Sequence, residues 1–437
     1  MKRIFILCIL LASLYSASVS ENVAIETAQN FISSRSDIHS FSEIQSFEED
    51  NNTFVYIIKL NPRGFVLISG NDIAMPVLGY SFENNFSDDI PIQVDYLLNV
   101  YKSNIQEAIE ENIIASQEIN DLWSLYSQPF DYSQERNVTP LLTCNWNQDS
   151  PWNDMCPEDF EGPGGNVYAG CVAISMAQVM YYWGYPEWGY GSHGYNPGGG
   201  YGYQNADFGN TFYDYENMED YFATEASQLL IYHAGVAVNM GYSPNGSGAS
   251  VMGGSNSTYS AMKNYFIFDH SIYRIYADDT PVNQYRDYLQ SDLDENQPII
   301  YVGYNNDGGH AWNLDGYEGD YFHSNFGWGG SNNGYYLLSA MNGFDYGQAA
   351  LINIIPEVLD DPHIVLMETA YFELDGDGDQ EINPGETVAY YTTIENFVPW
   401  DDANSVTLVL ESMSSDLSIS SESTYIGDLA SGQEYSN

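Results

Sequence analysis

The sequence has few basic residues: 10 Lys and Arg stand against 61 Asp and Glu, which gives a formal net charge of −51. Contacts to nucleic-acid phosphates need Lys and Arg, so this balance excludes a nucleic-acid-binding protein. It also disfavours adhesion to anionic membranes. After the first residues, no stretch holds the roughly 18 consecutive apolar residues that a spanning helix needs. We therefore expect a mature chain without a membrane span.

The first residues have the pattern of an export signal. Basic residues at Met1–Arg3 precede an apolar run over Ile4–Leu14, and small residues follow at Ser16–Ser20. The apolar run is too short to cross a membrane. We therefore predict a signal peptide over residues 1–20 and a secreted, extracellular protein, with attachment to the cell surface left open.

Cysteine is scarce as well. Cys8 leaves with the signal peptide, so Cys144, Cys156 and Cys171 remain, an odd number for an oxidising compartment. The simplest partition pairs Cys144 with Cys156 and leaves Cys171 free and reactive; the alternative is that Cys144 and Cys156 are unpaired core thiols. No Cys or His spacing suits a structural zinc site.

The chain is organised around the stretch that contains Cys171. A glycine-rich loop over residues 162–170 leads to this cysteine, and apolar residues then recur at helical spacing up to Trp183. Gly184 and Pro186 end the predicted helix. A thiol at a helix N-terminus lies in the positive end of the dipole, which lowers its pKa and favours the nucleophilic thiolate. A small apolar residue that packs the helix start is the competing interpretation.

A cysteine nucleophile needs a base that accepts its proton. His310 is the leading candidate among seven histidines, because Gly308 and Gly309 place it at the start of a predicted buried strand. A hydrogen-bonded core histidine has the same pattern, and His233 and His323 are competing candidates for the base.

Two further side chains could complete such a site. Gln148 could donate to an oxyanion together with the backbone N–H of Cys171, although a surface loop glutamine is the commoner case. Asn325 lies two residues after His323 on one predicted strand, so both side chains face the same side. Asn325 could orient His310 across adjacent strands.

These motifs together resemble the streptopain family of secreted bacterial cysteine proteases, distant relatives of papain. The resemblance extends over about residues 25–355. It is carried by the stretches Trp146–Gln148, Gly170–Met180, Gly309–Gly316, Asn325–Gly330 and, near the N-terminus, Gly64–Tyr80.

The resemblance implies a role for each candidate. Cys171 would be the nucleophile, His310 its proton acceptor and Gln148 the oxyanion donor. Phe326 stands where the family usually has a tryptophan, so either Asn325 or Trp328 could support the histidine. The Cys144 and Cys156 pair is also unusual for the family.

The resemblance also implies an α+β fold in consecutive domains. We expect a signal peptide over 1–20, an α+β inhibitory propeptide over 21–135 and a papain-like peptidase domain with helix-rich and β-rich halves over 136–357. Alternating strands after residue 360 predict a β-sandwich-like module over 360–437, which we expect to be incomplete.

One acidic loop lies outside the family motifs. Its acidic residues follow the oxygen-ligand spacing of an EF-hand loop, but Gln380 replaces the usual glycine and the flanks read as strands. We predict a structural calcium site there, with a solvated acidic turn as the alternative. The expected ligands are the side chains of Asp375, Asp377, Asp379 and Glu386 and the backbone carbonyl of Glu381.

The sequence thus predicts a secreted cysteine endopeptidase, made as a zymogen, that acts on proteins or peptides without a catalytic cofactor. Its own propeptide would be an intramolecular inhibitor. Two alternatives stay open: a papain-fold binding or adhesion protein with altered catalytic residues, and an amidase.

Overall fold

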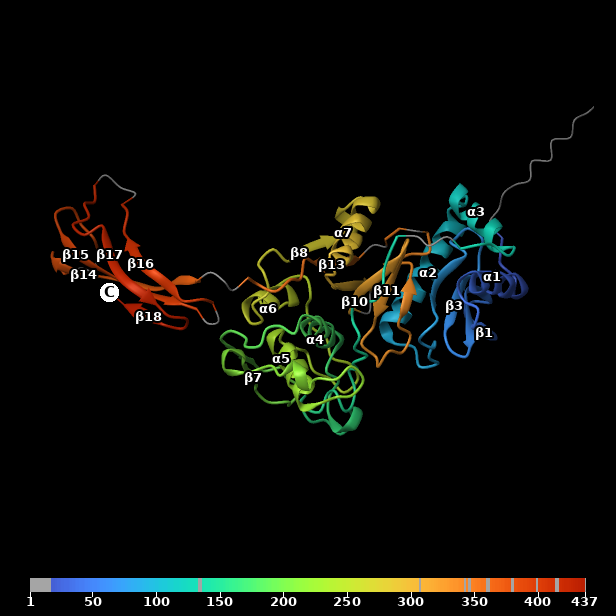
Figure 1. The fold of residues 1–437 in the computed structure, drawn as a ribbon, viewed down its shortest axis with the longest axis horizontal. Helices are drawn as coiled ribbons and strands as arrows, with labels where there is room; N and C mark the ends of the chain where they lie inside the picture. Colours follow the sequence, from blue (N-terminus) through green and yellow to red (C-terminus); the bar gives the residue numbers. More distant parts are fainter. Residues whose placement is uncertain are drawn as a thin grey trace, which may run out of the picture.

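The computed structural model describes residues 17–132, 136–305, 308–341, 343–344, 347–358, 362–378, 381–397, 400–412 and 416–436. Along these ranges the chain forms three consecutive parts, coloured from blue through green and orange to red in Figure 1. Helices and strands are mixed in the first two parts, whereas the third is built of strands. This is the α+β organisation that the sequence predicts.

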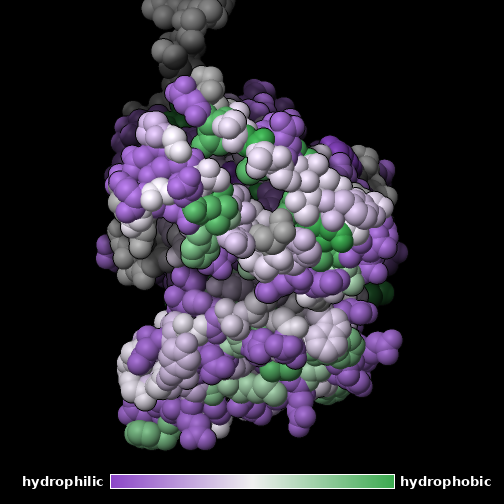
Figure 2. Space-filling model, turned by 90° about the vertical axis from the view of Figure 1, so that its left-hand side faces the viewer, coloured by the Kyte–Doolittle hydropathy of each residue, from purple (hydrophilic) through white to green (hydrophobic). Residues whose placement is uncertain are grey.

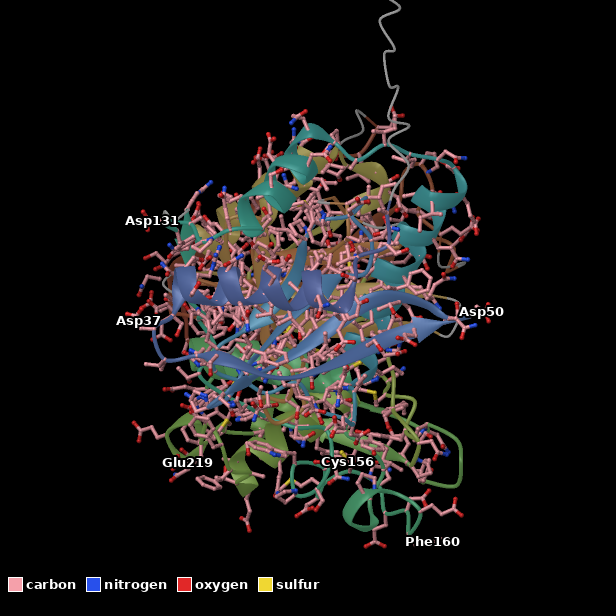
Figure 3. The ribbon with its side chains drawn as sticks, turned by 90° about the vertical axis from the view of Figure 1, so that its right-hand side faces the viewer. Asp37, Asp50, Asp131, Cys156, Phe160 and Glu219 are labelled. Atoms are coloured by element: carbon pink, nitrogen blue, oxygen red, sulfur yellow. The ribbon has the colours of Figure 1, made fainter. Side chains whose placement is uncertain are left out.

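The first part, up to residue 132, is a small sheet with helices. Serine side chains cap two of its helices: Ser20 accepts from the Val23 N–H and Ser116 from the Ile119 N–H. Asp37 and Asp50, at opposite sides of Figure 3, flank the first strand. The elements are α1 (Glu21–Arg35), β1 (Ser40–Glu49), β2 (Asn52–Asn61), β3 (Phe65–Ser69), β4 (Val77–Ser81), α2 (Ile92–Glu110) and α3 (Gln117–Tyr126).

The second part, residues 136–358, combines helices with longer strands. Its helices are α4 (Cys171–Trp183), α5 (Glu225–Ala237), α6 (Thr258–Asn264) and α7 (Val282–Asp294), with short 3-10 turns at Pro163–Gly165, Phe208–Asn210, Tyr215–Asn217 and Ala277–Asp279. Its strands are β5 (Asn137–Val138), β6 (Ser192–Tyr195), β7 (Gln204–Asp207), β8 (Tyr273–Tyr276), β9 (Ile299–Asn305), β10 (Gly308–Glu318), β11 (Tyr321–Asn325), β12 (Gly334–Tyr336) and β13 (Gln348–Ile352).

The two parts share one sheet. Its strand order is β1-β2-β3-β4-β12-β11-β10-β9-β13-β8, and β5 pairs with β10 away from this path. The joint is the antiparallel pairing of β4 with β12, where Tyr80 lies opposite Tyr335 and Gly79 opposite Tyr336. The first part is therefore continuous with the second through backbone hydrogen bonds.

Helices α2 and α4 pack on opposite faces of β10. On one face Trp312 and Leu314 join a core that also contains Tyr96 of α2. On the other face Ala311 joins the core around α4. Figure 1 shows α2 beside the orange strands and α4 below them. Strand β10, which carries His310, is thus enclosed by one helix from each part.

The third part contains two small antiparallel sheets. One has the order β14-β15-β18 and the other pairs β16 with β17, around a core of Ile394, Ala403 and Leu429. This matches the β-rich region expected after residue 360. The strands are β14 (Ile364–Asp375), β15 (Thr387–Asn396), β16 (Ala403–Val409), β17 (Ser423–Leu429) and β18 (Glu434–Ser436).

The surface reflects the polar composition. The face drawn in Figure 2 is mostly purple and white, with apolar residues in small separate groups. Within the described ranges, no helix is both long and apolar enough to cross a membrane.

Candidate active site

The N-terminus of α4 places Cys171 beside strand β10. Gly170 precedes it with a φ of 94°, and a Cβ there would lie 2.8 Å from the Met240 side chain, so the position requires glycine. The Ala311 backbone N–H donates to the Cys171 sulfur. Burial raises the pKa of the Cys171 thiol, opposite to the direction predicted from the helix dipole. Lost solvation of the thiolate outweighs the N–H groups that face the sulfur.

His310 lies in β10 directly before Ala311. Because side chains alternate between the faces of a strand, His310 shares the face of Trp312 and not that of Ala311. Ala311 packs in the core with Cys171, whereas Trp312 packs in the core with Tyr96. The His310 ring centroid lies 6.3 Å from that of Tyr96. The imidazole is therefore directed towards α2 in this structure.

Gln148 lies in the loop that packs against the start of α4. Its carbonyl accepts from the Ala169 N–H at 2.9 Å, two residues before Cys171, and its own N–H donates to Asn147 Oδ1 at 2.7 Å. The Gln148 side chain is 4% exposed, and its Nε2 has no hydrogen-bond partner among the described residues. A buried donor without a partner is unfavourable unless a ligand or a reaction intermediate supplies the acceptor.

Asn325 ends β11 opposite Asn313, three residues along β10 from His310. Its amide donates to the Cys144 carbonyl at 2.9 Å, and its Oδ1 accepts from the Gly327 N–H and from Gln178 Nε2, each at 3.2 Å. These contacts tie Asn325 to the α4 side of the sheet.

Helix α2 contributes a buried glutamine that contacts the loop after β11. Gln93 Nε2 donates to the carbonyls of Ala311 at 3.1 Å and Phe326 at 3.3 Å. Gln93 Oε1 accepts from the Trp328 indole N–H at 2.8 Å. Trp328 also packs edge-on against Tyr168, with ring centroids 5.9 Å apart. The first part of the chain therefore bonds to the residue after His310 and to Trp328.

Tyr96, one helical turn after Gln93, covers the neighbouring strand. A Cβ on Gly303 would lie 2.3 Å from the Tyr96 ring, and Gly303 is the residue paired with His310. The sequence analysis assigns no role to Gln93 or Tyr96. The only sequence signal for a shared role is their spacing of three residues, which places both on one face of a helix. Ordinary core residues have the same spacing, so this signal does not identify them.

The competing histidines have structural partners of their own. His233 Nδ1 lies 2.9 Å from the Tyr213 hydroxyl, and burial lowers the pKa of His233 to about 4. His323 Nδ1 lies 2.6 Å from Oδ1 of the buried Asp315. Asp315 in turn accepts from the Leu142 N–H at 3.1 Å.

The expected disulfide is wrong for this structure. Cys144 and Cys156 are free, as is Cys171. Cys144 is buried and its backbone carbonyl accepts from the Asn325 amide, whereas Cys156, labelled in Figure 3, contacts the Tyr242 hydroxyl. Burial raises the pKa of Cys156 to about 12. Both side chains behave as core thiols, the alternative that the sequence left open.

The acidic loop of the third part brings together two of its expected ligands. Asp377 and Glu386 meet Glu373, and one carboxylate oxygen from each lies within 4.8 Å of the others. Sequence spacing missed Glu373, which β14 places beside the loop. The Asp375 carboxylate lies outside this group, and Asp379 lies outside the described residues. The backbone carbonyl of Glu381 stays a prediction, because the group contains carboxylate oxygens only. The grouped carboxylates are hard oxygen donors, the ligand type that suits calcium.

Comparison with known proteins bears on both main parts of the chain. The Peptidase C10 family model matches residues 146–336, and the Spi protease inhibitor model matches residues 16–105. Streptopain from Streptococcus pyogenes is 26% identical over 338 residues, which cover 69% of this chain and 81% of streptopain. The thiol protease/hemagglutinin PrtT from Porphyromonas gingivalis is 27% identical over 405 residues, 84% of this chain and 45% of PrtT.

The structural comparison agrees with the family models. A fragment of prointerpain A from Prevotella intermedia superposes with a TM-score of 0.58 at 28% identity, covering 72% of this chain and 99% of that one. The expected papain-like α+β fold with a preceding propeptide is thereby confirmed. The chain belongs to the peptidase C10 family of streptopain, as a cysteine peptidase with a propeptide inhibitor domain.

Proposed function

We propose that the chain is the precursor of a secreted cysteine endopeptidase. In the reaction, the Cys171 thiolate attacks the carbonyl carbon of a peptide bond, and the oxyanion accepts hydrogen bonds from Gln148 Nε2 and the Cys171 N–H. The His310 imidazolium protonates the leaving amine. Water, deprotonated by His310, then attacks the thioester and releases the new carboxyl end and the free thiol.

The unpaired Nε2 of Gln148 is the observation that carries this proposal. It is buried next to the residues that lead into Cys171, and its site lacks an acceptor among the described residues. A tetrahedral oxyanion would supply that acceptor. A binding protein on the same fold would gain nothing from keeping this donor unsatisfied.

Two features support an inhibited precursor. The His310 ring faces Tyr96 of the propeptide, and burial keeps the Cys171 thiol neutral by raising its pKa. Release of α2 would free the imidazole to form an ion pair with the thiolate. We assign the support of that imidazole to Trp328, because Trp328 and His310 both contact α2 while the Asn325 amide is bonded elsewhere.

The export signal belongs to the same proposal. Residues 1–16, which contain most of it, lie outside the described residues. A peptidase that is made inactive and exported accounts for both the leader pattern and the propeptide. An amidase or a binding protein would need no inhibitor over its site.

A time course of the purified precursor beside Cys171→Ala, under mild reductant, tests the proposal. We expect the wild type to lose its propeptide and to gain casein hydrolysis that a thiol alkylator blocks, while the alanine variant does neither. If neither protein cleaves itself, and both stay inert even after an added protease has cut the linker near Asn137, the peptidase assignment fails for this chain.

We assign the acidic loop to a structural Ca²⁺ ion held by Glu373, Asp377 and Glu386, without a part in catalysis. Backbone N–H groups of Gly378 and Asn383 already bond to Glu373 and Glu386, each at 2.7 Å, which fixes these carboxylates. Calcium should raise the unfolding temperature of the third part by a few degrees over EDTA. Glu386→Gln should remove this shift, and the exposed Glu411→Gln should not.

A further inference from the structure

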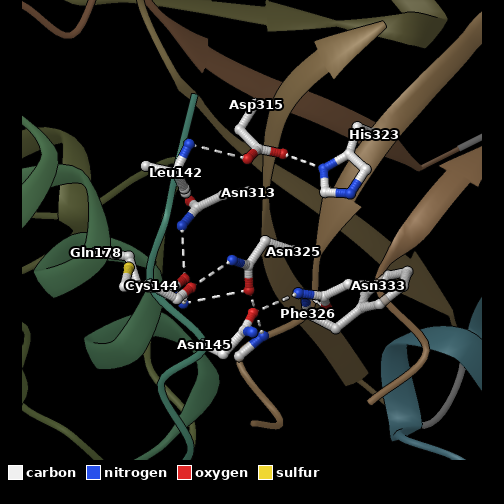
Figure 4. A network of polar contacts seen from close by, with 11 residues as sticks. Leu142, Cys144, Asn145, Gln178, Asn313, Asp315, His323, Asn325, Phe326 and Asn333 are labelled. Carbon is white, nitrogen blue, oxygen red and sulfur yellow. Dashed lines mark hydrogen bonds and ion pairs between the residues drawn. The ribbon is translucent and has the colours of Figure 1, made fainter. Parts of the chain in front are cut away.

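The four side chains assigned to the reaction lie on four separate segments of the chain. Cys171 begins α4, His310 lies in β10, Trp328 follows β11, and Gln148 lies in the loop after Cys144. Catalysis requires these segments to keep their relative positions within a fraction of an ångström. A chain of buried amides, which we call the relay, connects these four segments; Figure 4 shows its members Asn313, Gln178, Asn325 and Cys144.

The relay consists of three side-chain amides and one carbonyl. Asn313 of β10 donates to Gln178 Oε1 at 2.9 Å, and Gln178 of α4 donates to Asn325 Oδ1 at 3.2 Å. Asn325, which ends β11, donates to the Cys144 carbonyl at 2.9 Å. Gln178 Nε2 also lies 3.5 Å from that carbonyl. Each segment that carries an assigned group therefore provides one member.

The loop after β11 also contacts the Gln148 loop directly, outside the relay. Asn333 accepts from the Phe326 N–H at 3.0 Å and donates to Asn145 Oδ1 at 3.4 Å, while the Gly329 N–H donates to the Trp146 carbonyl at 3.0 Å. The segment from Cys144 to Gln148 thus follows the loop after β11 closely.

The relay members are far from solvent. Gln178 and Asn313 are 0% exposed and Asn325 is 2% exposed. Burying amides is unfavourable unless they are bonded, and apolar side chains of equal size would fill the space with less penalty. Each amide donates a hydrogen bond to the next member, so a shift of one member weakens the hydrogen bonds of its neighbours. Such a network fixes geometry more than it adds stability.

We propose that Gln178 is a positioning residue for peptide-bond hydrolysis, holding the Gln148 donor in register with Cys171 through Asn325 and Cys144. The inference rests on the proposed function, because it assigns Gln178 to the oxyanion site of that reaction. It also gives Asn325 a different task from orienting His310. Gln178 lies two helical turns after Cys171, so any displacement of α4 passes directly to this relay.

Gln178→Met tests the proposal in the enzyme released from the full-length precursor. Methionine keeps the side-chain volume and removes both polar groups. We expect kcat to fall by about 10- to 100-fold with KM within about twofold of wild type, because the oxyanion forms only in the transition state. Gln290→Met is the matched control. It removes another buried amide, that of Gln290 on α7, which donates to the Gly319 carbonyl at 2.8 Å, and it should leave kcat unchanged.

A double-mutant cycle separates positioning from general loosening. Gln148→Ala alone should lower kcat by about 10²- to 10³-fold. Adding Gln178→Met to it should change kcat by less than about threefold, because the donor that Gln178 positions is already gone. Three outcomes would each overturn the inference: a double variant whose kcat loss is the product of the two single losses, an unchanged kcat in Gln178→Met, or an equal kcat loss in Gln290→Met.

Two arrangements keep the test decisive. If Gln178→Met does not fold, Asn325→Leu replaces it, because leucine has a similar volume and removes the donor to the Cys144 carbonyl without adding a charge. This variant is judged by the same cycle. Alkylation of Cys171 by iodoacetamide, mapped by peptide mass, needs no oxyanion donor and should change by less than about threefold in Gln178→Met. Absence of Cys171 labelling in the active wild type would reject the proposed nucleophile, while the relay is judged on kcat.

Discussion

At the scale of single residues, His233 is a buried group whose charge state affects folding. It lies in α5 with 6% exposure, and burial lowers its pKa from 6.5 to about 4. The unfolded chain therefore binds a proton on this residue in a pH range where the folded chain does not. Its contribution to stability is complete above about pH 6.5 and is lost as pH falls towards 4, by roughly 3 kcal/mol.

Comparing His233→Gln with wild type separates the pH-dependent stability contribution of His233 from that of the many carboxylates. We expect the wild type to lose more unfolding temperature than the variant between pH 7 and 4.5, so the difference between the two proteins changes with pH. Thermal unfolding of the inactive Cys171→Ala form of each protein provides the measurement. A difference that stays constant across this range would contradict the predicted linkage.

Residue chemistry was predictable where a motif constrains it, and unpredictable where packing decides. The motifs around Cys171 and His310 predicted the family, which is confirmed. The direction of the Cys171 pKa was predicted wrongly, because its burial in the core around α4 depends on contacts that no local pattern encodes. The wrong disulfide prediction has the same cause, because the packing of the core decides where the Cys144 and Cys156 thiols lie, and both are free.

At the scale of elements, α2 is the propeptide helix that contacts β10 and Trp328, and the proposed inhibition depends on it. Gln93→Ala would leave the Ala311 and Phe326 carbonyls and the Trp328 indole without their partner. Losing these bonds should weaken docking by about 1–3 kcal/mol, which raises the open population about 5- to 150-fold. The rate of Cys171 alkylation in the uncleaved precursor should rise by a similar factor.

Gln106→Ala is the control on the same helix. Its side chain is exposed and bonds to Glu110 within α2, so alkylation should match wild type. Equal rates in Gln93→Ala and wild type would remove Gln93 from the inhibitory contact.

Most elements near the site follow from sequence periodicity, and two departures have local causes. Apolar residues recur at helical spacing from Tyr96 to Tyr126, which predicts helix over this stretch. The structure divides it into α2 and α3, because Asn112 adopts the left-handed conformation with a φ of 53°. Strand β1, Ser40–Glu49, was not predicted, since it lies at the sheet edge and lacks the apolar alternation of a half-buried strand. α4, in contrast, begins at Cys171 and ends at Trp183 as its apolar spacing predicts.

At the scale of the whole molecule, the propeptide and the peptidase fold as one body. The β4–β12 pairing joins strands about 250 residues apart in the chain, and one apolar core contains residues from both, among them Phe65, Tyr80, Phe322 and Tyr336. No local pattern predicts such a pairing. Removing the propeptide leaves β12 paired with β11 alone, as an exposed edge strand, and uncovers that core, so the precursor should be more stable than the mature enzyme.

Gly79 in β4 offers a change confined to this joint. A Cβ there would lie 2.8 Å from the Tyr336 ring and 3.0 Å from the Tyr335 carbonyl, so Gly79→Val should push β4 from β12. We expect the Cys171→Ala precursor with this change to unfold several degrees lower, and the active precursor to mature several times faster. The mature enzymes released from the wild-type and the Gly79→Val precursors should have the same kcat/KM and unfolding temperature, because maturation removes residue 79. Unchanged precursor stability and maturation time would mean that α2, and not the shared sheet, holds the propeptide in place.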